Sequence, residues 1–118
     1  MEVIMTRSEF NKCIRWLFEH CETTLVVKGK EYAPNRDRLD HFKKAAALLR
    51  STPEKALLGQ LTKHLVSIID MVESPETYTE AKWIEKIGDS INYLALLYGV
   101  ICERLPQQPY SGGDVDEA

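Results

Sequence analysis

The sequence lacks a long apolar segment. Its longest uninterrupted apolar run, residues 93–102, contains ten residues, whereas a helix that spans a bilayer needs about 20. We therefore expect no membrane partner. No positively charged stretch followed by an apolar stretch stands near residue 1, so we also expect no secretory signal.

Cysteine is scarce, and its odd count of three argues against a disulfide framework. The spacing of these residues is also unlike that of metal-binding cysteines. We interpret them as reduced core residues of a cytoplasmic protein: Cys13, Cys21 and Cys102. The motifs GxxxxGK[ST], GxGxxG and HExxH are absent, which removes the common phosphate-binding loops and the zinc proteases from consideration.

An excess of basic residues is also missing. The net charge is −3, and residues 106–118 account for it because they contain three acidic residues and no Lys or Arg. The other residues are balanced, so we expect no binding to duplex nucleic acid. We predict one domain, residues 1–105, followed by a disordered acidic tail, residues 106–118.

Strand patterns are nearly absent, and apolar residues recur instead at helical spacing. Thr6 and Glu9 form a capping-box pattern, and Thr52 followed by Pro53 is a typical helix start. These signals predict an all-α, four-helix bundle-like fold with helices over residues 7–26, 37–50, 53–73 and 76–105. The apolar face expected for the third helix comprises Leu57, Leu61, Leu65, Ile68 and Val72.

The last predicted helix is apolar on all sides over residues 93–102. We assign one face to the core of a single chain: Ile84, Ile87, Ile91, Leu94 and Cys102. The roughly opposite face, with Leu96, Gly99 and Val100, also requires burial. Because four helices of this length cannot surround one of their number, we predict a homodimer or a higher homo-oligomer.

Glu85, Asp89 and Asn92 recur at i, i+4 and i+7, so they share one stripe of that helix. The stripe continues into the face of Leu96, which places acidic groups where burial begins. A buried carboxylate needs a partner, such as a Lys or Arg, a backbone N–H or a divalent metal. Two carboxylates and an amide oxygen suit Mg²⁺. The alternative is an exposed face on which Lys82 and Lys86 neutralise both acids.

Charge is segregated along the chain. Residues 28–50 contain seven Lys or Arg against three acids, and residues 70–89 contain six acids against two Lys. A nucleotide polyphosphate suits this distribution, because cations bind its phosphates while carboxylates hold Mg²⁺. Attraction between the two segments in the folded chain explains it equally well.

Several residues near these segments are candidate nucleotide ligands. Lys30 and Lys63 would neutralise phosphates, and Tyr32 would stack on a base or else cover the core. His64 lies at the boundary of an apolar face, where a hydrogen-bonded structural histidine is the alternative. The candidate substrate-binding residues are Lys30, Tyr32, Arg36, Lys63, His64 and Asn92.

The stretch EKIGDSINYLALL resembles the EELGDLLFYLLLL-type helix of the all-α NTP pyrophosphohydrolases, the MazG-like superfamily. The layout of residues 28–98 is also similar to small bacteriophage-encoded MazG-like proteins whose function is largely unassigned. The resemblance implies dimeric four-helix units that bind Mg²⁺. It places Asp89 on the aspartate of the motif, Glu85 on its first glutamate and Lys86 on its second. The upstream E-x-x-E motif is matched only by Asp70 and Glu73.

The resemblance implies Mg²⁺-dependent cleavage of an NTP or dNTP to the monophosphate and pyrophosphate. Asp70, Glu85 and Asp89 would hold the metal, with Glu85 and Asp89 catalytic. Lys86 stands where the family has a metal ligand, and this favours a non-catalytic binder of a nucleotide or signalling nucleotide. A third interpretation is a protein-interaction module whose last helix serves only as a dimer interface.

Overall fold

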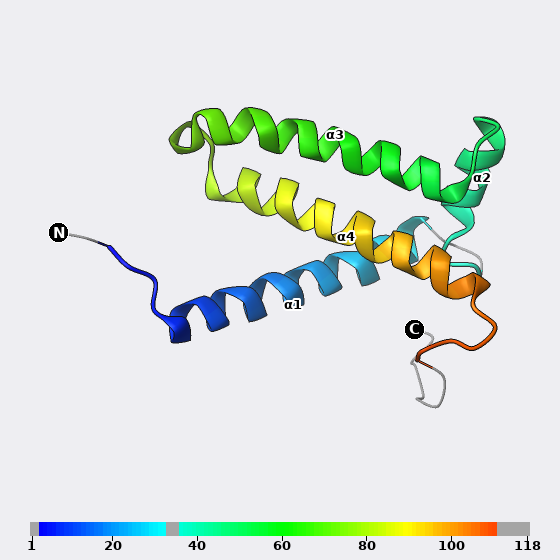
Figure 1. Ribbon diagram of the computed structural model, residues 1–118, viewed down its shortest axis with the longest axis horizontal. Helices are drawn as coiled ribbons and strands as arrows, with labels where there is room; N and C mark the ends of the chain where they lie inside the picture. The colour runs from blue at the N-terminus through cyan, green and yellow to red at the C-terminus, as the bar shows by residue number, and fades with distance from the viewer. Residues whose placement is uncertain (1–2, 33–35, 111–118) are drawn as a thin grey trace.

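The computed structural model describes residues 3–32 and 36–110 and confirms an all-α chain of four helices. They are α1 (Arg7–Tyr32), α2 (Asp40–Leu48), α3 (Pro53–Glu73) and α4 (Glu80–Arg104), with a 3₁₀ turn (Pro75–Thr77) before α4. Figure 1 shows α3, α4 and α1 side by side, with α4 in the middle and the short α2 across one end. None of the described helices is long and apolar enough to cross a bilayer. Residues 111–118 of the predicted tail lie outside the described residues.

Helix α1 begins at Arg7 as predicted, with the Thr6 hydroxyl accepting a hydrogen bond from the Glu9 N–H at 3.1 Å. It does not end near residue 26 but continues through Gly29 to Tyr32. The prediction of a loop here was wrong because it took Gly29 and Pro34 as loop signals and so relied on the low helix propensity of glycine. A tertiary contact overrides that preference: the Arg38 side chain crosses so close to Gly29 that a Cβ there would lie 2.6 Å from its Nε.

The predicted boundaries of α3 are confirmed, since Thr52 accepts a hydrogen bond from the Lys55 N–H at 3.2 Å and the helix ends at Glu73. The other two predictions began too early. Asp37 caps the turn before α2 by accepting from the Leu39 N–H at 3.0 Å, so this helix begins at residue 40 and not 37. Helix α4 begins at residue 80 and not 76, because Thr79 is its cap and accepts from the Lys82 N–H.

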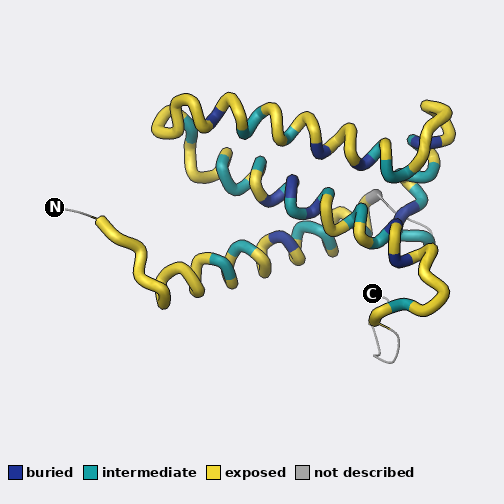
Figure 2. The backbone as a smooth tube through the Cα atoms, viewed as in Figure 1, coloured by how far each residue is buried: buried dark blue, intermediate teal, exposed yellow. Residues whose placement is uncertain are grey.

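The core lies where α2, α3 and α4 meet. Leu39, Leu57 and Val100 are buried there, and partly buried side chains pack around them: Phe42, Tyr93, Leu96 and Leu97. Figure 2 shows the buried segments gathered between the helices and at the α2 end. Helix α1 contributes one buried side chain, Cys21, which packs against α4. Its thiol lies 3.8 Å from the Gly88 carbonyl oxygen. Burial, with a contribution from Asp89, raises the pKa of this thiol.

The predicted core face of α4 is wrong in part. Ile87 and Leu94 are exposed, whereas Val100, assigned to the opposite face, is fully buried. On α3, Leu57 and Leu61 are buried as predicted, but Leu65 and Val72 are exposed. The reason is that α4 contacts α3 on one side and α1 on another, and the sequence pattern does not specify which apolar sides these neighbours occupy. Cys13, expected in the core, is likewise exposed on α1.

Candidate functional site

A cavity of about 320 Å³ lies against α4, between α1, the start of α2 and the start of α3. Its walls come from segments distant in sequence, and three of its side chains also belong to the core: Phe42, Tyr93 and Leu96. This volume is at the small end of the range of ligand pockets, about 300–1,000 Å³. Its polar and charged lining residues are Lys28, Arg38, His41, Gln60, Asp89 and Asn92.

Asp89 and Asn92, both predicted from sequence, line this cavity from successive turns of α4. Asp89 is mostly buried and has two close neighbours. The Nζ of Lys28 lies 3.8 Å from its Oδ1, and the Nε2 of His64 lies 3.9 Å from its Oδ2. The sequence predicted that this carboxylate needs a partner, which could be a Lys or Arg, a backbone N–H or a divalent metal. The structure provides a lysine, Lys28.

Asn92 is only 7% exposed, and its amide is half satisfied. The Nδ2 donates a hydrogen bond to the Cys21 carbonyl oxygen at 3.2 Å, whereas the Oδ1 has no hydrogen-bond partner among the described residues. An unpaired buried acceptor costs about 1–3 kcal/mol.

Arg38 reaches the cavity from the turn before α2, where its Nη2 donates to the Leu25 carbonyl oxygen at 3.3 Å. Burial lowers the pKa of its guanidinium, yet an arginine remains protonated at any physiological pH. No carboxylate of the described residues forms an ion pair with it within 4.0 Å. Arg38 is therefore a partly desolvated cation that can bind an anionic group with several N–H donors.

His64 stands behind Asp89 rather than in the cavity wall. Its ring lies 5.3 Å from that of Tyr93, and its Nδ1 is buried without a hydrogen-bond partner among the described residues. Burial lowers its pKa, and the attraction of Asp89 opposes this shift only in part. This shift favours the neutral imidazole, which lies between Asp89 and the Tyr93 ring without a hydrogen bond to either.

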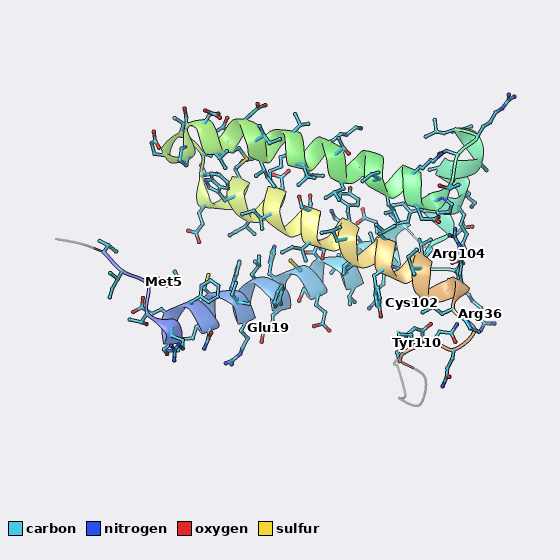
Figure 3. All side chains as sticks on the ribbon, viewed as in Figure 1. Met5, Glu19, Arg36, Cys102, Arg104 and Tyr110 are labelled. Atoms are coloured by element: carbon cyan, nitrogen blue, oxygen red, sulfur yellow. The ribbon has the colours of Figure 1, made fainter. Side chains whose placement is uncertain are left out.

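The structure does not bring the remaining predicted residues to this cavity. The Glu85 side chain is half exposed and lies 3.7 Å from Lys82 and 3.9 Å from Lys86, which is the salt-bridged alternative described above. Arg36 is exposed and lies at the edge of the molecule in the view of Figure 3. Lys30, Lys63 and Asp70 are exposed and do not line the cavity. The side chain of Tyr32 lies outside the described residues.

The predicted Mg²⁺ ligands are therefore dispersed. Among residues 3–32 and 36–110, no three His, Cys, Asp or Glu side chains are close enough together to hold a metal ion. Asp89 faces the cavity, whereas Glu85 is paired with lysines on the outside of the same helix. One carboxylate and one amide oxygen do not form an all-protein Mg²⁺ site, so a Mg²⁺ ion at Asp89 would take its remaining ligands from waters and from a bound phosphate.

Lys28 and Arg38 were not among the predicted site residues. Both belong to the basic segment 28–50, but its seven cations cannot be ranked by charge alone. Lys28 could have been found from its register, because it follows Cys21 and Leu25 at i+7 and i+3 on the α1 face that meets α4. This spacing applies to Lys28 only if the first helix is predicted to continue beyond residue 26. No local signal distinguishes Arg38 from Arg36.

Comparison with known proteins identifies no relative: no family model matches the chain, and no curated protein or solved structure matches it. The MazG-like resemblance therefore stays a prediction, and the function must be argued from the cavity itself.

Proposed function

We propose that this protein binds a mononucleotide in the cavity beside α4 and does not need a metal ion to do so. The observation that carries the proposal is that a partly desolvated cation, Arg38, lines the same cavity as two aromatic side chains, Phe42 and Tyr93. An anion and a planar ring are the two features of a nucleotide that these groups match.

The charge of the cavity favours a phosphate. Lys28 and Arg38 contribute two positive charges and Asp89 one negative charge, which leaves one positive charge on its lining. The guanidinium suits two oxygens of one phosphate, because charge-assisted bidentate hydrogen bonds are stronger than neutral ones. Lys28 lies beside Asp89 and provides a second cation for the same phosphate.

The apolar side of the cavity suits a base. Phe42, Tyr93 and Leu96 form a wall that packs against the core. Aromatic side chains and bases attract one another by stacking, which contributes about 1–3 kcal/mol per base. The cavity volume of 320 Å³ limits the enclosed part to one nucleotide.

The dispersed carboxylates favour binding over cleavage. The Mg²⁺-dependent pyrophosphohydrolase expected from the resemblance needs Glu85 and Asp70 beside Asp89, and α4 directs Glu85 to its two lysine neighbours instead. Of the two nucleotide functions predicted from sequence, we therefore propose the non-catalytic one. Hydrolysis stays a prediction that the experiment below also tests.

The test is isothermal titration calorimetry of the full chain with nucleoside mono-, di- and triphosphates, each in EDTA and in Mg²⁺. A parallel assay measures pyrophosphate release from the triphosphates. We expect saturable heat with at least one nucleotide in EDTA and no pyrophosphate release. Absence of binding to every nucleotide in both buffers would refute the proposal, and Mg²⁺-dependent release of pyrophosphate would establish the enzyme instead.

The variant Asp89→Asn distinguishes metal-free from Mg²⁺-dependent nucleotide binding, because we expect it to raise the affinity in the first case and to lower it in the second. Without metal, the substitution removes a negative charge beside Lys28, so we expect affinity in EDTA to rise by up to about fivefold, which corresponds to about 1 kcal/mol for one such charge pair. If Asp89 holds Mg²⁺, the same variant loses affinity in Mg²⁺ buffer alone. A loss of affinity in EDTA contradicts metal-free binding of the kind proposed here.

Gly29→Ala tests whether the position of Arg38 matters. The new Cβ would lie 2.6 Å from the Nε of Arg38 and 3.1 Å from its Cδ, so the flexible arginine side chain must move away. We expect the affinity for nucleotide, measured by calorimetry, to fall roughly tenfold, while helicity is kept because alanine is favoured over glycine by about 1 kcal/mol in helices.

Gly59→Ala is the matched control for this variant. Gly59 also lies in a helix, and nothing stands within 4 Å of a Cβ built there, so the same substitution leaves the cavity untouched. We expect its affinity for nucleotide to equal that of the wild type. Unchanged affinity in Gly29→Ala as well would show that the position of Arg38 is irrelevant to binding.

A further inference from the structure

Asp89 is an acidic residue in a cavity whose lining also holds the cations Lys28 and Arg38. Its side chain is 20% exposed, and the Nζ of Lys28 and the Nε2 of His64 lie 3.8 and 3.9 Å from its two oxygens. Both distances exceed that of a hydrogen bond, so Asp89 acts on its surroundings mainly through its charge. A carboxylate at this place repels any second negative charge of a bound anion.

The charge that the cavity offers to a ligand follows from these side chains. Asp89 offsets Lys28, the cation nearest to it. Arg38 forms no ion pair within 4.0 Å with a carboxylate of the described residues. Burial favours the neutral form of His64, which stands behind Asp89, because it lowers the pKa of this ring. The uncompensated charge is therefore that of one partly buried guanidinium.

A partly desolvated site favours a ligand whose charge is equal and opposite to its own. Attraction grows in proportion to the charge of the ligand, whereas the cost of removing the ligand from water grows with the square of that charge. A phosphodiester carries one negative charge, and a phosphomonoester carries nearly two at neutral pH because its second pKa is about 6. One guanidinium matches the diester and leaves the second charge of a monoester unneutralised beside Asp89.

The size of the cavity favours a compact diester. Its volume of about 320 Å³ is at the small end of the range of ligand pockets. In a cyclic mononucleotide one phosphate closes a ring on its own ribose, so this diester is shorter than the open 5′-monophosphate of the same base. A dinucleotide is also a diester, but it adds a second base and sugar to a cavity that encloses one nucleotide.

We infer that the cavity selects a cyclic mononucleotide, and that Asp89 sets this preference by repelling a second negative charge. The inference rests on the proposed nucleotide binding and adds the chemical class of the ligand to it. The base stacks on Phe42 and Tyr93, and the single phosphate charge pairs with Arg38. Lys28 faces the same phosphate while it stays paired with Asp89.

The test is calorimetric titration of the full chain in EDTA at pH 8, where an ordinary histidine is neutral. The ligands are the 3′,5′-cyclic and the 5′-monophosphate forms of adenosine, guanosine, cytidine and uridine. For the base that binds most tightly, we expect the cyclic form to bind at least about fivefold more tightly than the monophosphate. One unmatched charge at about 4 Å contributes about this factor even at the dielectric constant of water.

The 5′-(methyl phosphate) ester of the same nucleoside separates charge from shape. It is open like the monophosphate but carries one negative charge like the cyclic form. We expect its affinity to lie close to that of the cyclic form. This comparison uses the wild-type chain, so it stays valid even if a variant fails to fold.

Asp89→Asn tests the origin of the preference. Without the carboxylate the lining carries two positive charges, so we expect the monophosphate to gain about fivefold in affinity and the cyclic form to change little. Glu85→Gln is the matched control, because it removes an acid one turn earlier on the same helix. Glu85 is paired with Lys82 and Lys86 and does not line the cavity, so we expect the wild-type ratio of affinities.

The outcomes separate this inference from the proposed function. A monophosphate that binds the wild type as tightly as its cyclic form overturns the selectivity and leaves nucleotide binding intact. A methyl ester that binds no better than the monophosphate overturns the role of charge. An unchanged ratio in Asp89→Asn, or an equal change in Glu85→Gln, overturns the role of Asp89. If none of these ligands binds, the proposed function fails and this inference fails with it.

Discussion

Arg38→Gln is expected to weaken nucleotide binding by about 10- to 100-fold. Hydrogen bonds to charged groups contribute about 1.5–3 kcal/mol, and each 1.4 kcal/mol corresponds to a factor of ten in affinity. The side chain is partly desolvated and donates to the Leu25 carbonyl oxygen, so its guanidinium is already oriented beside the cavity. Glutamine keeps much of the length and a hydrogen-bond donor but removes the charge. Calorimetry in EDTA measures the loss.

Arg36→Gln provides the matched control, because it makes the same substitution two residues earlier. Arg36 is exposed at the edge of the molecule and does not line the cavity. We expect its effect on affinity to be less than about twofold, the size of a screened surface charge. Equal losses in both variants would mean that nucleotide is attracted by the general charge of residues 28–50, not by the cavity.

Leu57→Ala is expected to lower the free energy of unfolding by about 2–5 kcal/mol, the range found when a buried leucine is truncated. Leu57 is 1% exposed and joins α3 to Leu39 and Val100 in the core. The same core supports Phe42 and Tyr93, so a void there also loosens the aromatic wall of the cavity. Nucleotide affinity should therefore fall together with stability.

Urea unfolding followed by circular dichroism measures this loss, at one fixed protein concentration because any association contributes to stability. Leu48→Ala is the control, since its side chain is 84% exposed and leaves no cavity when truncated. We expect it to change the free energy of unfolding by less than about 0.5 kcal/mol. A similar cost for the two leucines would contradict the assignment of the core to the junction of α2, α3 and α4.

The helical architecture was predictable wherever local chemistry decides it. Thr52 and Pro53 specify the start of α3, and Thr6 specifies that of α1, because their side chains satisfy backbone N–H groups within the same turn. The end of α1 was not predictable in this way. Gly29 is a weak helix former and reads as a loop signal, yet the helix continues through it where the Arg38 side chain crosses, a contact between residues nine positions apart.

The candidate site was predicted in part. Asp89 and Asn92 were found because their helical spacing leads from a polar stripe into a buried one, and both line the cavity. Glu85 obeys the same spacing but lies one turn nearer the exposed end of α4, where lysines surround it. Periodicity places residues on a side of a helix, but it does not specify where along the helix a neighbouring element begins to cover that side.

The sequence by itself determined that this protein is all-α and where its helices α1 and α3 begin. These properties follow from hydrogen bonds and periodicity within a few residues. Only the tertiary structure decided which sides of α4 meet α1 and α3, which cations reach Asp89, and which apolar side chains stay exposed. Those outcomes depend on how long helices pack against each other, and the free energy of that packing is shared among residues far apart in the chain.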